Sequence, residues 1–307
     1  MASSRPSGPS GPSGPSDPSD PSRPRSRSGP GVPRLLYVTD LAYEARGRRY
    51  CDEDIQLSAR LREDFDVALC HPLDAAALMD GFDLVVVRNS GPVIHYQEAY
   101  DAFRSRALRD GVRVYNPLTG RADMAGKRYL VELTGAGLPV IPTVDRPEDL
   151  DRLPEAAAYV IKPEFGADSI GLRTVGRADL ARLDFREHGG LLAQPRIDFR
   201  YEVSFYFVDD AFQYALYAPR PERRWHLEPY VPTAEDLDFA RRFIAWNTLS
   251  HGIQRVDACR APDGRLLLVE LEDLNPYLSL EALGAREREA FAESLTASLR
   301  RFLAAGT

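Results

Sequence analysis

Lysine is scarce in this sequence. Of its 39 basic residues, 37 are arginine, and lysine occurs only at positions 127 and 162. Arginine carries a planar fork suited to paired contacts, whereas the lysine ammonium is a compact charge that fits between the oxygens of a polyphosphate. The two lysines therefore indicate two positions at which arginine does not suffice. The alternative is a codon-biased genome that left two lysines by chance.

Cysteine and long apolar runs are scarce too. The three cysteines (Cys51, Cys70 and Cys259) are odd in number and form no CxxC spacing, so a disulfide framework is not indicated. No apolar run approaches the roughly 20 residues of a membrane span, and no apolar segment follows the N-terminal arginines as a signal peptide requires. We therefore expect a cytoplasmic protein that does not act at a membrane.

Length and charge narrow the class further. A chain of 307 residues can hold two or three cores, and its net charge of −7 argues against a general nucleic-acid binder. Residues 1–33 are rich in Ser, Gly and Pro and predict a disordered low-complexity tail. Beyond the tail we expect three blocks, at 34–117, 118–190 and 191–307.

The first block shows the βαβ rhythm of a parallel sheet. We expect strands at 34–39, 66–70, 82–87 and 112–115, and helices at 54–63 and 96–110. Ligands of such sheets gather at the carboxyl ends of the strands, which points to Arg88, Asn89 and Ser90. We expect Arg88 to contact a substrate carboxylate; a surface-loop arginine is the alternative.

Both lysines fall in the second block. Lys127 lies near the start of a helix expected from residue 122 to the glycines at 135 and 137. Lys162 closes a predicted strand and precedes a loop with glycines at 166 and 171, whose backbone N–H groups could face an anion. The loop is not a Walker A motif, and a hairpin connection is the alternative.

The third block contains a predicted β-hairpin around Pro262-Asp-Gly. If its loop has an even number of residues, Asp257 pairs directly with Glu270, and strand alternation places Glu272 on the same face. Like charges opposed across strands are destabilising, so we expect a compensating cation, and Mg2+ shared with phosphates fits best. Asn275 could supply a further oxygen. A solvent-facing charged hairpin is the alternative.

With the lysines, the glycine loop, Gln194 and the carboxylate hairpin in this order, residues 34–303 resemble the ATP-grasp superfamily of carboxylate–amine ligases. Members include D-alanine–D-alanine ligase, glutathione synthetase and the cyclo-ligase that closes the D-cycloserine ring. The resemblance implies an α/β fold, with a Rossmann-like pre-ATP-grasp substrate domain at 34–117 followed by a two-lobed ATP-grasp domain. The central lobe would be 118–190, and the C-terminal lobe with the metal site would be 191–307.

The same resemblance implies roles for individual residues. Those that would bind ATP are Lys127, Lys162, Gly166, Ser169, Gln194, Ile197 and Glu202. Those that would bind the transferring phosphoryl group are Arg255 and Arg220. Those that would hold Mg2+ are Asp257 and Glu270, with either Glu272 or Asn275 in place of the asparagine that usually ends the family's Glu-x-Asn motif.

The activity implied is an ADP-forming ligation. A substrate carboxylate would be activated as an acyl phosphate and joined to an amine, giving an amide, a peptide bond or a closed ring. The partners would be a small-molecule carboxylate and amine of specialised metabolism, with no nucleic acid and no membrane, and a homodimer is compatible with the sequence. The alternatives are a small-molecule kinase with the same fold and a regulator that binds ATP without turnover.

Overall fold

The structure is a computed structural model that describes residues 31–45, 48–89, 93–166, 170–220, 223 and 226–305. At positions 44, 45, 48, 49 and 94 only the backbone is described. The chain forms two units, Met1–Val32 and Pro33–Thr307, and the fold and site below belong to the second. The predicted tail, 1–33, lies almost wholly outside the described residues.

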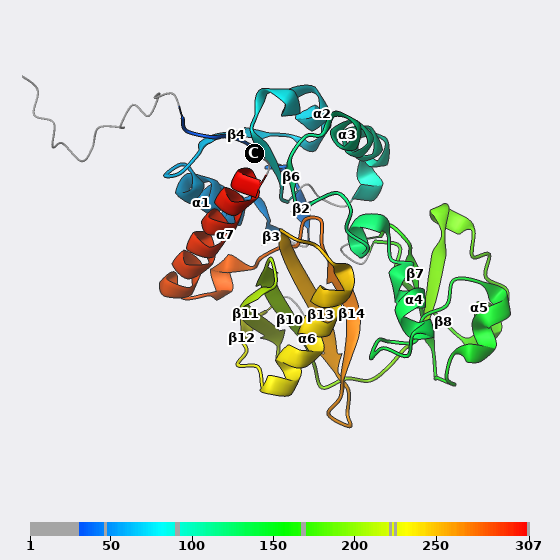
Figure 1. Cartoon of the computed structure of the whole chain (residues 1–307). Helices are drawn as coiled ribbons and strands as arrows, with labels where there is room; N and C mark the ends of the chain where they lie inside the picture. Colours follow the sequence, from blue (N-terminus) through cyan, green and yellow to red (C-terminus); the bar gives the residue numbers. More distant parts are fainter. Residues whose placement is uncertain are drawn as a thin grey trace, which may run out of the picture. The chain divides into compact units, whose positions relative to one another are not determined.

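The first sheet is parallel and has the strand order β4-β1-β5-β6, as the βαβ rhythm predicts (Figure 1). Its strands are β1 Arg34–Val38, β4 Asp66–Cys70, β5 Leu84–Val87 and β6 Val114–Tyr115. The helices around it are α1 Cys51–Leu61, α2 Ala75–Leu78, α3 Gln97–Asp110 and α7 Ala285–Ala305. Both faces of the sheet are covered, which explains the unbroken apolar run of β5.

Side chains of these strands alternate between two cores. Leu35 and Tyr37 pack in one core with leucines of α1 and α7, whereas Leu36 and Val38 pack in the other with Phe103 of α3. The C-terminal helix therefore completes the N-terminal sheet, although the predicted boundaries placed it in the third block.

The second sheet is antiparallel, with the strand order β12-β11-β10-β13-β14. Its strands are β10 Tyr201–Val208, β11 Ala211–Ala218, β12 Glu228–Pro229, β13 Ile253–Arg260 and β14 Leu266–Glu272. Helix α6, Ala234–Asn247, lies across one face (Figure 1) and buries Phe239 and Phe243 against Phe205. Its N-terminus is fixed by a capping box between Thr233 and Asp236. On the opposite face, Tyr206 and Tyr214 pack in the core that contains Phe291 of α7, whereas Glu202, Ser204 and Asp257 line the cavity described below.

The third sheet has the order β8-β7-β9 and carries Lys162 at the end of its central strand. Its strands are β7 Tyr159–Pro163, β8 Arg173–Val175 and β9 Leu191–Pro195, and nearby lie α4 Tyr129–Gly135 and α5 Arg177–Leu180. A two-stranded ribbon, β2 Glu44–Ala45 and β3 Arg48–Arg49, lies between β1 and α1 in the sequence. Because β9 pairs with β7, the predicted boundary at 190/191 separates two strands of one sheet.

The helix expected from residue 122 is interrupted. A short 3-10 helix spans Asp123–Ala125, Gly126 follows with φ +97°, and α4 begins only at Tyr129. A left-handed φ ends a helix and is readily adopted only by glycine. Lys127 consequently lies in the turn between two helical segments.

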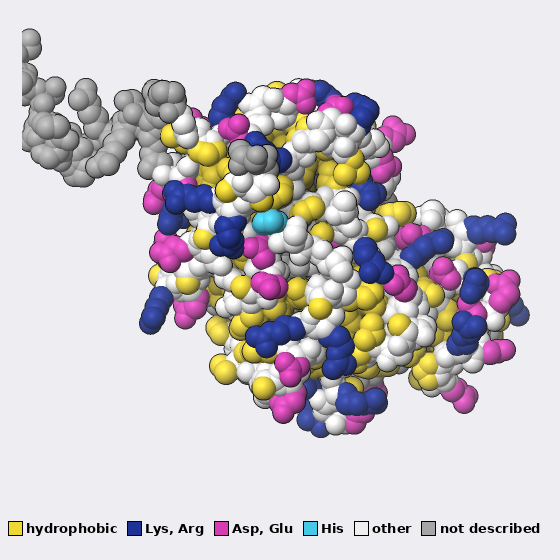
Figure 2. All heavy atoms as spheres, in the orientation of Figure 1, with side chains coloured by type: hydrophobic (Ala, Val, Ile, Leu, Met, Phe, Trp, Pro, Cys, Tyr) yellow, Lys and Arg dark blue, Asp and Glu magenta, His cyan; other side chains and the backbone are white. Residues whose placement is uncertain are grey.

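Within the described part of the chain, none of the helices has both the length and the apolar character needed to cross a membrane. On the face shown in Figure 2, basic and acidic side chains are interspersed over the surface. This face offers no broad basic field of the kind that nucleic-acid binding requires.

Candidate active site

A cavity of about 470 Å³ lies where residues of the second and third sheets meet segments that flank the first sheet, among them Tyr50 and Asn89. This volume is within the usual range for small-molecule sites. The predicted site residues that line it are Asn89, Lys127, Lys162, Gly166, Gln194, Ile197, Glu202, Arg255, Asp257, Glu270, Glu272 and Asn275. Arg88 and Arg220 are not among the lining residues, and Ser90 and Ser169 lie outside the described residues.

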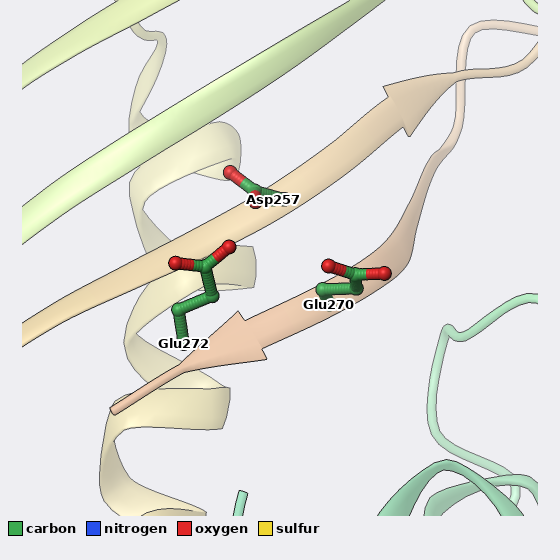
Figure 3. A group of neighbouring side chains, drawn as sticks. All are labelled: Asp257, Glu270 and Glu272. Carbon is green, nitrogen blue, oxygen red and sulfur yellow. The ribbon is translucent and has the colours of Figure 1, made fainter. Parts of the chain in front are cut away.

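Three carboxylates form the centre of the site. Asp257 on β13 stands directly opposite Glu270 on β14, in the predicted register. Glu272 faces the same side, and one oxygen from each residue lies within 4.8 Å of the other two (Figure 3). Such a group of oxygen donors suits a hard divalent cation.

Protein cations already balance this charge. The Arg255 guanidinium contacts both oxygens of Asp257, at 2.8 and 2.9 Å, and Glu272 Oε1 at 2.5 Å. Glu270 forms ion pairs with the ammonium groups of Lys127, at 3.2 Å, and of Lys162, at 3.6 Å. The repulsion between opposed carboxylates therefore does not by itself require a metal, which corrects the premise of the sequence argument.

The balance of charge is uneven, as the pKa values show. Burial would raise the pKa of Glu270, but the two lysines outweigh it and lower that pKa to about 2. For Glu272, burial and the neighbouring carboxylates prevail over Arg255 and raise the pKa to about 8. Burial also lowers the pKa of Lys162. A negative charge near Lys162 would stabilise its charged form, which burial disfavours. A positive charge near Glu272 would stabilise the charged form of that carboxylate in the same way.

The two lysines meet because the backbone joins their segments. The Lys127 N–H donates to the Glu164 carbonyl at 3.0 Å, which ties the turn after Gly126 to the end of β7. Both side chains are buried, with 4% of Lys127 and 7% of Lys162 exposed. The Lys127 ammonium also pairs with Asp123. Two buried ammonium groups beside one carboxylate can also bind the oxygens of a phosphate group.

At another part of the cavity lie the residues expected around adenine and ribose. Gln194 is 2% exposed, and its amide donates to the Thr143 hydroxyl at 2.9 Å. Ile197 follows the end of β9, and Glu202 stands at the start of β10. These positions are compatible with the predicted contacts.

Arg88 is placed differently from the expectation. It is 1% exposed, and its Nη2 donates to Glu53 Oε1 at 3.1 Å and to the Pro276 carbonyl at 2.9 Å. Asp54 lies 3.8 Å from its Nε. The guanidinium faces the interior rather than the cavity, so this geometry does not support the expected contact with a substrate carboxylate.

Arg220 is exposed and lies just beyond the carboxyl end of β11. Ala218, at that end of the strand, lines the cavity. The implied contact of Arg220 with a phosphoryl group therefore stays a prediction.

Two acidic residues of the site were missed in the sequence. Asp123 lines the cavity four residues before Lys127, a spacing typical of a helical ion pair. Glu164 is 8% exposed and accepts from Arg128 at 2.8 Å. A Cβ at Gly190, where φ is +132°, would come within 2.6 Å of Glu164 Oε2, a close approach that the sequence alone does not reveal.

Comparison with known proteins adds a sequence relative. No protein-family model matches the chain. The cycloserine biosynthesis protein DcsG of Streptomyces lavendulae is 28% identical over 269 residues, covering 74% of this chain and 88% of that protein.

Several solved structures share the fold. The crystal structure of D-cycloserine synthetase DcsG matches with a TM-score of 0.65 and 24% identity, covering 85% of this chain and 99% of that one. D-alanine–D-alanine ligase from Bacillus anthracis, complexed with ATP, matches at 0.61 and 14%, covering 89% and 98%. The ATP-grasp ligase PsnB, complexed with its precursor peptide PsnA2 and AMPPNP, matches at 0.57 and 18%, covering 87% and 97%.

These matches confirm the fold class as the mixed α/β fold of the ATP-grasp ligases. The sequence relative and the structural matches agree with the resemblance predicted from the motifs and support an ATP-grasp ligase.

Proposed function

We propose that the protein uses ATP and Mg2+ to activate a small-molecule carboxylate as an acyl phosphate and then joins it to an amine, releasing ADP and phosphate. The observation that carries this proposal is the convergence on one cavity of two buried lysines, Arg255 and three carboxylates. Binding alone does not require this full set of charges.

The donor set fits a magnesium ion. Asp257, Glu270 and Glu272 offer oxygens close enough together to share one cation, and Asn275 lines the same cavity. Magnesium prefers oxygen ligands, a few carboxylates and substrate phosphates among them. When bound, it would neutralise phosphate charge during transfer. Either Glu272 or Asn275 would complete the pair Asp257 and Glu270.

The residues of the chain would then divide the work. Lys127 and Lys162 bind the phosphate oxygens as mobile point charges, and Glu270 holds both ammonium groups in place until the nucleotide arrives. Gln194 and Ile197 contact the adenine, Glu202 the ribose hydroxyls, and the backbone at Gly166 with Ser169 covers the phosphates. These seven residues would form the nucleotide half of the cavity.

Arg255 would act in the transfer itself. Its guanidinium is fixed by Asp257 and Glu272, so it can stabilise charge on the transferring phosphoryl group without reorganising. A carboxylate oxygen attacks the γ-phosphorus and ADP leaves. The amine nitrogen then attacks the acyl carbon, phosphate leaves, and the nitrogen loses a proton. Holding both reactants in one cavity supplies much of the rate enhancement.

We further propose that residues 34–117 contribute the acceptor side of the cavity and that the two remaining blocks bind the nucleotide. In this division α7 packs with the first block, and β9 belongs to the same sheet as β7. The substrates would be small molecules of specialised metabolism, and the protein would work in the cytoplasm. A homodimer remains part of the proposal.

The test is a screen for acid-dependent turnover. The protein is incubated with ATP, Mg2+ and pooled amino and hydroxy acids, with hydroxylamine as a surrogate amine. A ligase releases ADP and traps a hydroxamate, and Lys162→Met, which keeps the length of the side chain without its charge, should abolish both. A stable phosphorylated acid would indicate a kinase, and ATP binding without turnover on any pool would indicate a regulator.

A further inference from the structure

The segment Asp273–Ser279, between β14 and a short 3-10 helix at Leu280–Ala282, lies against the cavity without regular secondary structure. It is largely buried: Asp273 and Leu278 are 0% exposed and Ser279 2%. Backbone groups in a buried irregular segment must find partners outside any helix or strand. Those partners determine where its side chains point.

Four buried or half-buried side chains supply them. The Pro276 carbonyl accepts from Arg88 Nη2 at 2.9 Å, and the Leu278 N–H donates to Glu53 Oε1 at 3.0 Å. The carbonyl of Tyr277 accepts from Arg255 Nη1, and that of Leu278 from the Tyr214 hydroxyl, each at 2.8 Å. Three consecutive residues are thus held from both sides.

Glu53 and Arg88 act together in this clamp. Arg88 Nη2 lies 3.1 Å from Glu53 Oε1, and 4% of Glu53 and 1% of Arg88 are exposed. Glu53 Oε1 also accepts from the Asn89 amide at 3.1 Å, and Asn89 lines the cavity. One carboxylate oxygen therefore fixes a cavity residue of the first sheet and the backbone that carries Tyr277.

The clamped segment forms one wall of the cavity. Asn275 and Tyr277 line it. The Tyr277 ring packs edge to face against the ring of Tyr50, another lining residue, with 4.5 Å between the ring centroids. This wall belongs to the first sheet and the 273–279 segment, whereas Gln194 and Ile197 lie at the end of the third sheet. Arg255 connects the wall to Asp257 and Glu272, because its Nη1 donates to the Tyr277 carbonyl.

We propose that Glu53 and Arg88 are positioning residues for the acceptor side of the cavity: they set the backbone of Pro276–Leu278 so that Asn275 and Tyr277 receive the carboxylate substrate beside Arg255. This inference rests on the proposed function. It gives Arg88 an indirect part in recognition of the acid, with no contact to substrate.

The test compares Glu53→Ala and Arg88→Met with two controls. Glu53→Gln keeps an oxygen that can accept from the Leu278 N–H. Ser298→Ala removes a fully buried hydroxyl that bonds Asp209 and Tyr115, away from the cavity, and so controls for a general loss of stability. Hydrogen exchange over 273–279 in the free protein reports the clamp directly. AMPPNP affinity and the KM of the acid selected in the hydroxamate screen report the two halves of the site.

We expect Glu53→Ala and Arg88→Met to increase exchange over 273–279 and to raise the KM for the acid about 10- to 100-fold, because small misplacements of reacting groups are costly. AMPPNP affinity should stay unchanged. Ser298→Ala should resemble the wild type in exchange over 273–279 and in the KM for the acid, and Glu53→Gln, which keeps the acceptor oxygen but loses the charge facing Arg88, should lie between the wild type and Glu53→Ala. The inference would be overturned if Glu53→Ala and Arg88→Met lowered kcat and left the KM for the acid unchanged, since that indicates only a loss of folded protein. It would also be overturned if Ser298→Ala increased exchange over 273–279 as much as Glu53→Ala does. If no acid supports turnover in the wild type, the proposed function fails, while exchange and AMPPNP affinity still decide whether the clamp exists and spares the nucleotide half.

Discussion

Glu270 is the residue whose removal has the most distinctive consequence. In the free protein its carboxylate is the shared counterion of Lys127 and Lys162, at 3.2 and 3.6 Å. Glu270→Gln keeps the side-chain shape and removes the charge. Lys127 would keep its ion pair with Asp123, whereas Lys162 would lose its ion pair with Glu270.

The size of the effect follows from these distances. At an effective dielectric constant of about 20, each contact corresponds to about 5 kcal/mol of gross attraction, before desolvation and repulsion from Asp257 are subtracted. Breaking a buried pair by removing one partner typically costs about 3 to 5 kcal/mol. Because the Glu270 side chain is 24% exposed, we expect the lower end, about 3 kcal/mol. For a folded unit of the length of Pro33–Thr307, this corresponds to a fall in Tm of about 5 °C.

The assay is urea and thermal unfolding of wild type and variant in EDTA, with and without ATP. The triphosphate supplies negative charge to both lysines, so ATP should narrow the gap in stability between the two proteins. Glu289→Gln is the matched control, because Glu289 forms an exposed pair with Arg60 at 2.8 Å and surface pairs contribute little. Equal stability of Glu270→Gln and wild type without ATP, or a gap that ATP leaves unchanged, would refute the reasoning.

Three further predictions concern the same region. Lys162→Arg should raise the KM for ATP nearly as far as Lys162→Ala, since the guanidinium fork cannot replace a point charge; ATP kinetics like the wild type's would contradict this. Burial raises the pKa of Glu53 from 4.5 to about 7, so its contribution to stability is full below pH 4.5 and is lost as pH rises through about 7. The loss should total about 3 kcal/mol in urea unfolding and be absent in Glu53→Gln; an equal pH slope in both proteins would exclude it. Gly120→Ala would drive its Cβ into the Asp273 carboxylate and should cost about 1 to 3 kcal/mol and raise the KM for ATP, whereas Gly135→Ala, whose Cβ meets nothing within 4 Å, should do neither.

Local patterns in the sequence predicted the carboxylate hairpin but not how its register arises. Asp257 stands opposite Glu270 as predicted, but through a β-bulge between Asp257 and Ala258. Nearer the turn Ala258 pairs with Leu268, so regular pairing would have set Asp257 opposite Val269. The strands of the first sheet could also be predicted from a local pattern, because burial on both faces leaves a continuous apolar run.

Features that depend on distant residues could not be predicted in this way. Arg88 follows a strand end, as a ligand-binding residue would, but its partners Glu53 and Pro276 lie 35 and 188 positions away in the sequence. Likewise, Gly126 gives no sign in the sequence that its left-handed φ is needed; a Cβ there would come within 3.0 Å of Glu164 Oε1. The ion pairs of Glu270 with the two lysines were also missed, since the lysines were considered only as partners of ATP.

The central claim, transfer of the γ-phosphoryl group to a carboxylate, is tested most directly by following an oxygen atom. The acid selected in the hydroxamate screen is labelled with 18O in its carboxylate and incubated with the protein, ATP, Mg2+ and the amine, and the released phosphate is analysed by mass spectrometry. If the carboxylate attacks phosphorus and phosphate then leaves the acyl carbon, one labelled oxygen must appear in phosphate, with ADP as the other product. Label in AMP, or unlabelled phosphate beside the amide product, would contradict the account.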